Sequence, residues 1–142
     1  MPKLIGYKLA RFNLIKAPLP ILLNFSITNK CQSNCKTCNI WRLYKEYPEK
    51  EKEELKLDGI EKIFKSMKPI FLLNICGGEP FLRTDLPEIC ELATKYIKPK
   101  VIHIPTNCIS SEQIEKSTIR ILEKITRTTH LTIKLSIDGV GE

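Results

Sequence analysis

Apolar residues alternate with polar ones, or form short unbroken runs, in four separate stretches of the chain. These stretches cover residues 21–28, 71–76, 101–106 and 131–138. Alternation is typical of a strand with one covered face, and a short apolar run is typical of a buried parallel strand. The pattern therefore predicts four β-strands, with Pro18 and Pro20 keeping the approach to the first one extended.

Between these strands, apolar residues recur at helical spacing over residues 58–67, 85–96 and 110–125. Each helical stretch opens on a pair of residues typical of a capping box, in which two side chains three residues apart cap the first turn. The pairs are Asp58 with Glu61, Asp85 with Glu88, and Ser110 with Gln113. Strand and helix in strict alternation predict a parallel sheet with right-handed crossovers.

The fold class is therefore α/β, and the strand faces favour one architecture within it. A doubly wound sheet has helices on both faces and needs both to be apolar, whereas a barrel has helices outside only. The last strand points its apolar residues one way and its polar residues the other: Leu131, Ile133, Leu135 and Ile137 against Thr132, Lys134, Ser136 and Asp138. We predict a parallel-stranded partial (β/α) barrel over residues 21–142, preceded by a leader over residues 1–20 that forms a short helix.

Composition and charge narrow the function classes. The chain has 142 residues, of which 42% are hydrophobic and 27% charged, as in a globular domain, and its net charge is +7. The lysines alternate with glutamates along the chain and only 7% of residues are aromatic, which argues against a nucleic-acid site. No apolar run approaches the roughly 20 residues of a membrane helix, and no secretory signal is recognisable.

Three of the six cysteines are clustered. Cys31, Cys35 and Cys38 fall within eight residues, whereas Cys76, Cys90 and Cys108 are scattered. Without a secretory signal we expect a reducing, cytoplasmic location, where clustered cysteines indicate metal rather than disulfides. Three thiolates can hold three irons of a [4Fe–4S] cluster and leave the fourth open. The alternative is zinc, but a structural zinc site needs a fourth ligand, typically from a second paired motif, and no such pair is present.

A second motif, Gly77-Gly78-Glu79-Pro80, follows the second predicted strand. Two glycines allow the backbone to approach a ligand closely, and a carboxylate accepts hydrogen bonds from an amine. In isolation these residues could equally form an ordinary turn. At the carboxyl end of a barrel strand, where ligands bind, a binding role is favoured.

Together these residues resemble the radical SAM superfamily. The three-cysteine loop is similar to its cluster motif, and residues 77–80 are similar to its amine-binding motif. Two further segments resemble its third and fourth strand ends, at residues 106–108 and 135–139. The resemblance runs from about residue 19 to residue 139, in the family's order and spacing.

The resemblance implies cofactors and site residues. Cys31, Cys35 and Cys38 would hold a [4Fe–4S] cluster, with S-adenosylmethionine on the open iron. Reductive cleavage of S-adenosylmethionine would give a 5′-deoxyadenosyl radical that abstracts hydrogen from a substrate. The electron would come from an external donor such as a flavodoxin or a ferredoxin. The residues that would contact S-adenosylmethionine are Thr37, Gly77, Gly78, Glu79, Pro80, Asn107, Ser136 and Asp138.

The chain departs from the family's pattern at two positions. Thr37 stands where the family usually has an aromatic residue near the adenine, and Cys108 stands where it prefers glycine. We interpret Cys76, Cys90 and Cys108 as small buried hydrophobic residues. Trp41 is expected to pack against the cysteine loop.

The family's core has six strand–helix units, and the pattern here predicts about four. We expect a barrel truncated after residue 142, while a split barrel completed by a partner and a naturally short form stay open. The alternative functions are a noncatalytic iron–sulfur or zinc-binding module and a half-barrel that needs a partner. The substrate, a small molecule or a peptide, cannot be named from these residues.

Overall fold

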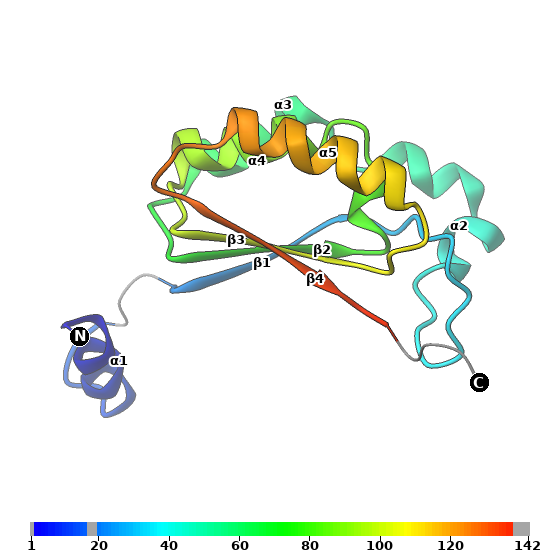
Figure 1. The fold of residues 1–142 in the computed structure, drawn as a ribbon. Coiled ribbons are helices and arrows are strands. Elements are labelled where there is room, and N and C mark those ends of the chain that lie inside the picture. The colour runs from blue at the N-terminus through cyan, green and yellow to red at the C-terminus, as the bar shows by residue number, and fades with distance from the viewer. Residues whose placement is uncertain (1, 17–19, 138–142) are drawn as a thin grey trace.

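The computed structural model describes residues 2–16 and 20–137. Its centre is a four-stranded sheet in the order β1-β2-β3-β4, and all three neighbouring pairs are parallel (Figure 1). The strands are β1 (Leu22–Thr28), β2 (Leu72–Gly77), β3 (Val101–Thr106) and β4 (His130–Leu135). The four predicted strands and their parallel pairing are thus confirmed.

Helices cover one face of this sheet. The three crossover helices α3 (Leu57–Ser66), α4 (Leu86–Tyr96) and α5 (Ser111–Lys124) lie together on the same side, and the opposite face carries none of them (Figure 1). Sequential strands are neighbours and the sheet is open, so the described chain is an α/β segment of barrel type rather than a doubly wound sheet. This confirms the predicted fold class.

Shorter helices lie outside this repeat. Helix α1 (Pro2–Arg11) forms in the predicted leader, while α2 (Arg42–Glu46) and the 3₁₀ helix η1 (Pro48–Glu53) follow the cysteine loop. A second 3₁₀ turn, η2 (Pro80–Leu82), follows β2. In the described part of the chain, no helix combines the length and the apolar character that crossing a bilayer requires.

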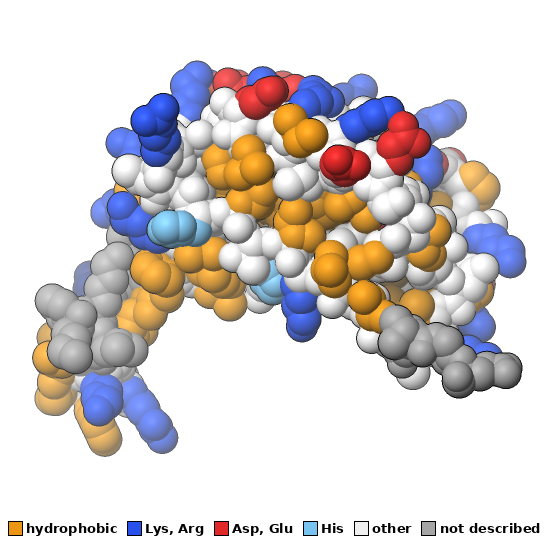
Figure 2. Space-filling model, in the orientation of Figure 1, with side chains coloured by type: hydrophobic (Ala, Val, Ile, Leu, Met, Phe, Trp, Pro, Cys, Tyr) orange, Lys and Arg blue, Asp and Glu red, His pale blue; other side chains and the backbone are white. Residues whose placement is uncertain are grey.

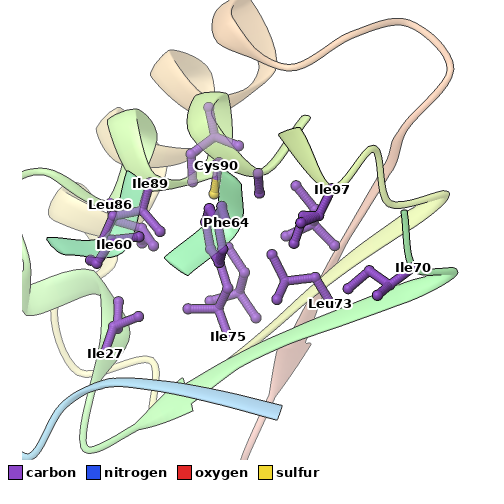
Figure 3. Close-up of a cluster of buried hydrophobic side chains, with 14 of the residues drawn as sticks. Ile27, Ile60, Phe64, Ile70, Leu73, Ile75, Leu86, Ile89, Cys90 and Ile97 are labelled. Atoms are coloured by element: carbon purple, nitrogen blue, oxygen red, sulfur yellow. The ribbon is translucent and has the colours of Figure 1, made fainter. Parts of the chain in front are cut away.

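The core lies between the sheet and the three helices (Figure 3). Ile60 and Phe64 of α3 meet Ile75 of β2 there, and all three are fully buried. Phe64 also contacts the ring of Phe25 on β1, with ring centroids 5.3 Å apart. The apolar strand face and the helix stripes therefore meet largely as their sequence periods predict, whereas Leu135 and Ile137, expected on the apolar face of the last strand, are exposed.

The other face of the sheet is more polar and partly open. Paired positions place Asn24, Asn74, His103 and Thr132 in one row across all four strands. Asn74 Nδ2 donates to Asn24 Oδ1 over 2.8 Å, while Asn74 Oδ1 is buried without a hydrogen-bond partner among the described residues. This row of polar groups, here called the open-face row, has unused hydrogen-bonding capacity.

Charged side chains gather over the helices, whereas hydrophobic side chains are visible lower down, towards β4 (Figure 2). Ile119 and Leu122 of α5 and Leu135 of β4 each expose more than half of their surface. Exposed apolar side chains are therefore present on α5 and at the end of β4, the edge strand of the described sheet.

The predicted capping box at Asp58 is wrong. Helix α3 begins at Leu57, so Asp58 lies inside its first turn and Lys56 is the N-cap. The proposed partner, Glu61, instead accepts from Tyr96 on α4 and pairs with Lys65. Its tertiary contact with α4 takes the place of the local cap.

At the other two helices the N-cap position is right, but the capping hydrogen bonds do not form. Asp85 precedes α4 and its carboxylate is held by Arg83 in a two-point pair. Ser110 precedes α5 and its hydroxyl accepts from Gln32 in the cysteine loop. Gln113, the expected partner of Ser110, donates to the carbonyl of Phe81. Asp85 is thus held by a side chain two residues away, whereas Ser110 and Gln113 have long-range partners in place of each other.

Candidate functional site

The carboxyl ends of the parallel strands gather the predicted site residues at one edge of the sheet. The cysteine loop leaves β1 after Thr28, Gly77 ends β2, and Asn107 directly follows β3. Ser136 follows β4, and Asp138 lies outside the described residues. Ligands bind at this edge in parallel α/β folds.

The cysteine loop is docked onto the diglycine by backbone hydrogen bonds. Gly78 N donates to the carbonyl oxygen of Thr28 over 2.7 Å, and Glu79 N donates to that of Lys30 over 2.8 Å. Cys31 follows immediately. The first cysteine is therefore fixed beside the Gly-Gly-Glu segment although the two are more than forty residues apart in sequence.

Both glycines are required by this close approach. A Cβ at Gly77 would overlap the carbonyl oxygen of Thr28, and a Cβ at Gly78 would overlap that of Lys30. Gly77 also has a φ of 130°, which other residues rarely adopt. The sequence predicts that the glycines approach a ligand; in the structure they admit the base of the cysteine loop, and their contact with S-adenosylmethionine stays a prediction.

The carboxylate of Glu79 joins β2 to β3. Glu79 is 1% exposed, and its Oε1 accepts from Phe81 N over 3.1 Å. Its Oε2 accepts from Thr106 Oγ1 over 3.1 Å and from Asn107 N over 2.7 Å. A carboxylate can accept about four hydrogen bonds, so these three leave about one position for an amine. Pro80 is buried directly after it and opens η2.

The three loop cysteines are free thiols with different exposure. Cys31 is half-buried, whereas Cys35 and Cys38 are exposed and joined by a backbone hydrogen bond from Cys38 N to Cys35 O. Within residues 2–16 and 20–137, no three Cys, His, Asp or Glu side chains are arranged to hold a single metal ion. A four-iron cluster binds its thiolates on separate irons, so it spreads its ligands more widely than one ion does. The thiol-only donor set fits such a cluster, and the cluster stays a prediction.

Asn107 connects β3 to the cysteine loop. Its Nδ2 lies 3.7 Å from Cys31 Sγ and 3.3 Å from Gln32 Oε1. Gln32 was not identified from the sequence, because a glutamine inside a loop carries no periodic or motif signal. The structure thus adds one amide side chain to the predicted site.

A second polar cluster, which the sequence did not reveal, joins residues from both ends of the cysteine loop. Glu54 Oε1 accepts from Thr28 Oγ1, Asn29 N and Tyr44 Oη. Burial and the neighbouring Glu54 carboxylate raise the pKa of Tyr44 to about 12. We call Thr28, Asn29, Tyr44 and Glu54 the Glu54 cluster; it ties the start of the cysteine loop to the connection that follows it.

The two departures from the family's pattern have different structural settings. Cys108 has a φ of 63°, so a non-glycine residue occupies the left-handed region where the family prefers glycine. Thr37 is exposed, next to Cys38. On the far side of the site Ser136 is exposed, and its backbone N–H donates to the carbonyl of Thr106. The contacts predicted for Thr37 and Ser136 with S-adenosylmethionine stay predictions.

The remaining cysteines are only partly as interpreted. Cys90 is fully buried in the core, and burial raises the pKa of its thiol. Cys76 and Cys108 are half-buried. Trp41 packs on the cysteine loop as expected, since its indole N–H donates to the carbonyl of Cys35 over 3.3 Å.

Comparison with known proteins agrees with this arrangement. Residues 25–142 match the radical SAM superfamily. The chain is 32% identical over 124 residues to a 7,8-dihydro-6-hydroxymethylpterin dimethyltransferase of Methanocaldococcus jannaschii, covering 86% of this chain and 23% of that protein. It is 42% identical over 91 residues to a probable GTP 3′,8-cyclase of Methanococcus maripaludis strain C5, covering 62% of this chain and 28% of that protein.

The chain spans about a quarter of the length of these two curated relatives. The family match, by contrast, covers most of the chain and includes the cysteine loop, the diglycine and the ends of β3 and β4. The chain therefore belongs to the radical SAM superfamily.

Proposed function

We propose that this chain is the cluster-binding part of a radical SAM enzyme, with a [4Fe–4S] cluster on Cys31, Cys35 and Cys38. One observation carries the proposal. The backbone hydrogen bonds of Gly78 and Glu79 hold the cysteine loop against the diglycine, at the carboxyl ends of parallel strands. This brings a loop of three free thiols next to a buried carboxylate that has acceptor capacity left.

Each group in the site would have a defined task. The thiolates of the three loop cysteines would hold three irons and leave one open for S-adenosylmethionine. The cluster, when bound, supplies the electron that splits S-adenosylmethionine into methionine and a 5′-deoxyadenosyl radical. Glu79, already fixed by three donors, would accept from the amine of S-adenosylmethionine without having to move. The base of the loop, packed on the glycines, would keep water away from that side of the site.

We further propose that the electron comes from an acidic external donor such as a flavodoxin or a ferredoxin. Cys35 and Cys38 are exposed, so the loop is accessible from solvent. Beside it, Arg42 and Lys45 place their cationic groups 5.4 and 5.5 Å from the centroid of the Trp41 ring. Exposed cations beside a redox loop favour encounter with an acidic partner. The rate of association with that partner should fall as added salt screens the charges.

For the substrate, we propose a nitrogen heterocycle that contacts the open-face row. The two relatives are named for a pterin and for GTP, both of which contain a fused ring with adjacent donors and acceptors. Asparagine amides recognise such edges with paired hydrogen bonds. Asn74 Oδ1 is buried without a partner among the described residues, so it would accept from a ring N–H once the side chain turned towards the open face. An Asn74→Leu variant should lose binding of GTP or of a reduced pterin in equilibrium dialysis.

The decisive experiment is anaerobic reconstitution of the chain with iron and sulfide. We expect about four irons and four sulfides per chain. The EPR signal of the reduced sample should change when S-adenosylmethionine is added, and 5′-deoxyadenosine should form. Cys35→Ala should remove the cluster, whereas the matched control Cys76→Ala, half-buried on β2 and outside the loop, should retain it.

The same sample separates the alternatives. A colourless protein with about one zinc per chain would contradict the proposal and support a zinc module. An iron–sulfur protein whose EPR signal ignores S-adenosylmethionine, with no 5′-deoxyadenosine formed, would indicate a noncatalytic cluster-binding module. If the EPR change and 5′-deoxyadenosine formation both required a stable complex with a second polypeptide, the half-barrel hypothesis would be supported.

A further inference from the structure

We infer that Asn107, oriented by Gln32, is a positioning residue that donates a hydrogen bond to the Cys31 sulfur and raises the reduction potential of the cluster. The inference rests on the proposed function. It concerns a side chain directly after β3 that acts through a thiolate of the cysteine loop, rather than a contact with S-adenosylmethionine.

The hydrogen bonds of Asn107 define which end of its amide faces the sulfur. Ile109 N donates to Asn107 Oδ1 over 3.1 Å, which identifies that atom as the acceptor. The NH₂ end is therefore the one that lies 3.7 Å from Cys31 Sγ. An amide in this orientation can only donate to the sulfur.

Gln32 fixes this orientation from the other side. Its Oε1 accepts from Asn107 Nδ2 over 3.3 Å, and its Nε2 lies 3.5 Å from Asn107 Oδ1. The same Nε2 donates to Ser110 Oγ over 3.3 Å. The two amides thus form a reciprocal pair that joins the cysteine loop to the turn after β3.

The backbone of Asn107 is equally constrained. Its N–H donates to Glu79 Oε2 over 2.7 Å, and Glu79 is buried and also bound by Thr106. Cys108, the next residue, is held at a φ of 63°. Asn107 therefore presents its amide from a turn that is fixed at both ends, which a flexible surface side chain could not do.

A donor at a ligand sulfur changes the electronic balance of an iron–sulfur cluster. Reduction adds negative charge, part of which resides on the thiolates, and an N–H pointed at the sulfur stabilises that charge. Cys31 is half-buried, so the interaction is less screened by water than it would be at the exposed Cys35 and Cys38. Removing the donor should make the cluster harder to reduce.

The test is an EPR-monitored redox titration of the reconstituted chain and its variants. Asn107→Asp keeps the acceptor for Ile109 N, removes the donor and adds a charge, so its midpoint potential should shift furthest to negative values. Asn107→Leu should shift in the same direction by less, and Gln32→Leu by the least. Asn13→Asp, an exposed asparagine of the amino-terminal segment, adds the same charge and should leave the potential unchanged.

The outcomes separate this inference from the proposed function. A wild-type chain that binds no cluster refutes both. A wild-type cluster that responds to S-adenosylmethionine, with unshifted potentials in all three variants, refutes only the role of Asn107. If both Asn107 variants lose their iron, the Gln32→Leu variant is the test. A negative shift of its midpoint potential supports the inference, and an unchanged midpoint potential overturns it.

Discussion

The helix-covered face of the sheet and the carboxyl edge of the same sheet are held together by different forces. On the covered face, Leu73 and Ile75 of β2 are fully buried against apolar helices, and packing alone stabilises the contact. At the edge, two residues further along β2, backbone hydrogen bonds hold the cysteine loop against the glycines, where a Cβ would clash with the loop. There the buried carboxylate of Glu79 also accepts from three donors. One strand thus serves both regions.

Stability and site chemistry can therefore be changed separately in the two regions. Apolar packing is non-directional and depends on the area buried, so a substitution there changes stability without removing a specific hydrogen-bond partner. The edge tolerates few substitutions. Each hydrogen bond there has a specific partner, and removing that partner leaves a buried polar group unpaired. Changes in the core should therefore reduce stability, whereas changes at the edge should reduce cluster binding as well.

The largest effect on stability is expected in the core. Phe64→Ala removes a fully buried ring that packs against Phe25 and should lower the free energy of unfolding by about 4 kcal/mol. Iron bound per folded chain should not change, because Phe64 belongs to the apolar core between the sheet and the helices. Urea unfolding and iron analysis of the folded fraction measure the two quantities. Phe64→Leu is the milder control, at about 1 kcal/mol. If Phe64→Ala protein folded but bound no iron, the core and the edge would not have the separate roles described above.

A slightly smaller loss of stability, but a loss of the cluster, is expected at Gly77. Gly77→Ala forces a Cβ into the carbonyl of Thr28 at a φ of 130° and should cost about 3 kcal/mol. The loop base must then move, so iron incorporation should fall sharply. Urea unfolding and iron content measure both effects.

Gly59→Ala is the matched control for Gly77→Ala. Gly59 lies in α3, where the new Cβ would meet only the end of the Leu55 side chain, at 3.3 Å. Alanine is the better helix former by about 1 kcal/mol, so this variant should be at least as stable as wild type. Full cluster binding by Gly77→Ala would show that the glycines do not position the loop.

The fold could be predicted almost entirely, because it depends on sequence periods. The alternation along β4 and the apolar run of β2 each identify a strand and its covered face, and burial of the apolar side is insensitive to detail. The helix caps failed for the opposite reason. Asp85 and Ser110 occupy the right positions, but the side chain of Asp85 pairs with the nearby Arg83, and that of Ser110 binds Gln32 from the distant cysteine loop.

The site could be predicted in its motifs but not in its connections. Cys31 and Glu79 are recognisable because their spacing is specific. That Asn107 donates to Cys31, or that Glu54 collects three donors, depends on where three strand ends meet. A single glutamine such as Gln32 has no local pattern, and its role exists only after the loop has docked.

The smallest effect is expected at the Glu54 cluster, where stability should depend on pH. Tyr44 donates to Glu54 over 2.6 Å, so Tyr44→Phe should lower the free energy of unfolding by about 1 kcal/mol near neutral pH. Burial first, and then the Glu54 carboxylate, raise the pKa of Tyr44 from 10.0 to about 12. The folded state therefore keeps a proton that the unfolded chain loses first.

Stability from this raised pKa is fully present below the unfolded-state value and is lost as pH rises through the folded-state value. Between pH 10.0 and about 12, wild type should therefore lose stability faster than Tyr44→Phe, and the gap between them should narrow. The other tyrosines and the lysines titrate in both proteins and cancel in the difference. Urea unfolding of both proteins at about pH 8 and about pH 11 measures the gap. A gap that stays constant would mean that Tyr44 is solvated like an ordinary surface phenol, and that the Glu54 cluster does not hold the loop as the other edge contacts do.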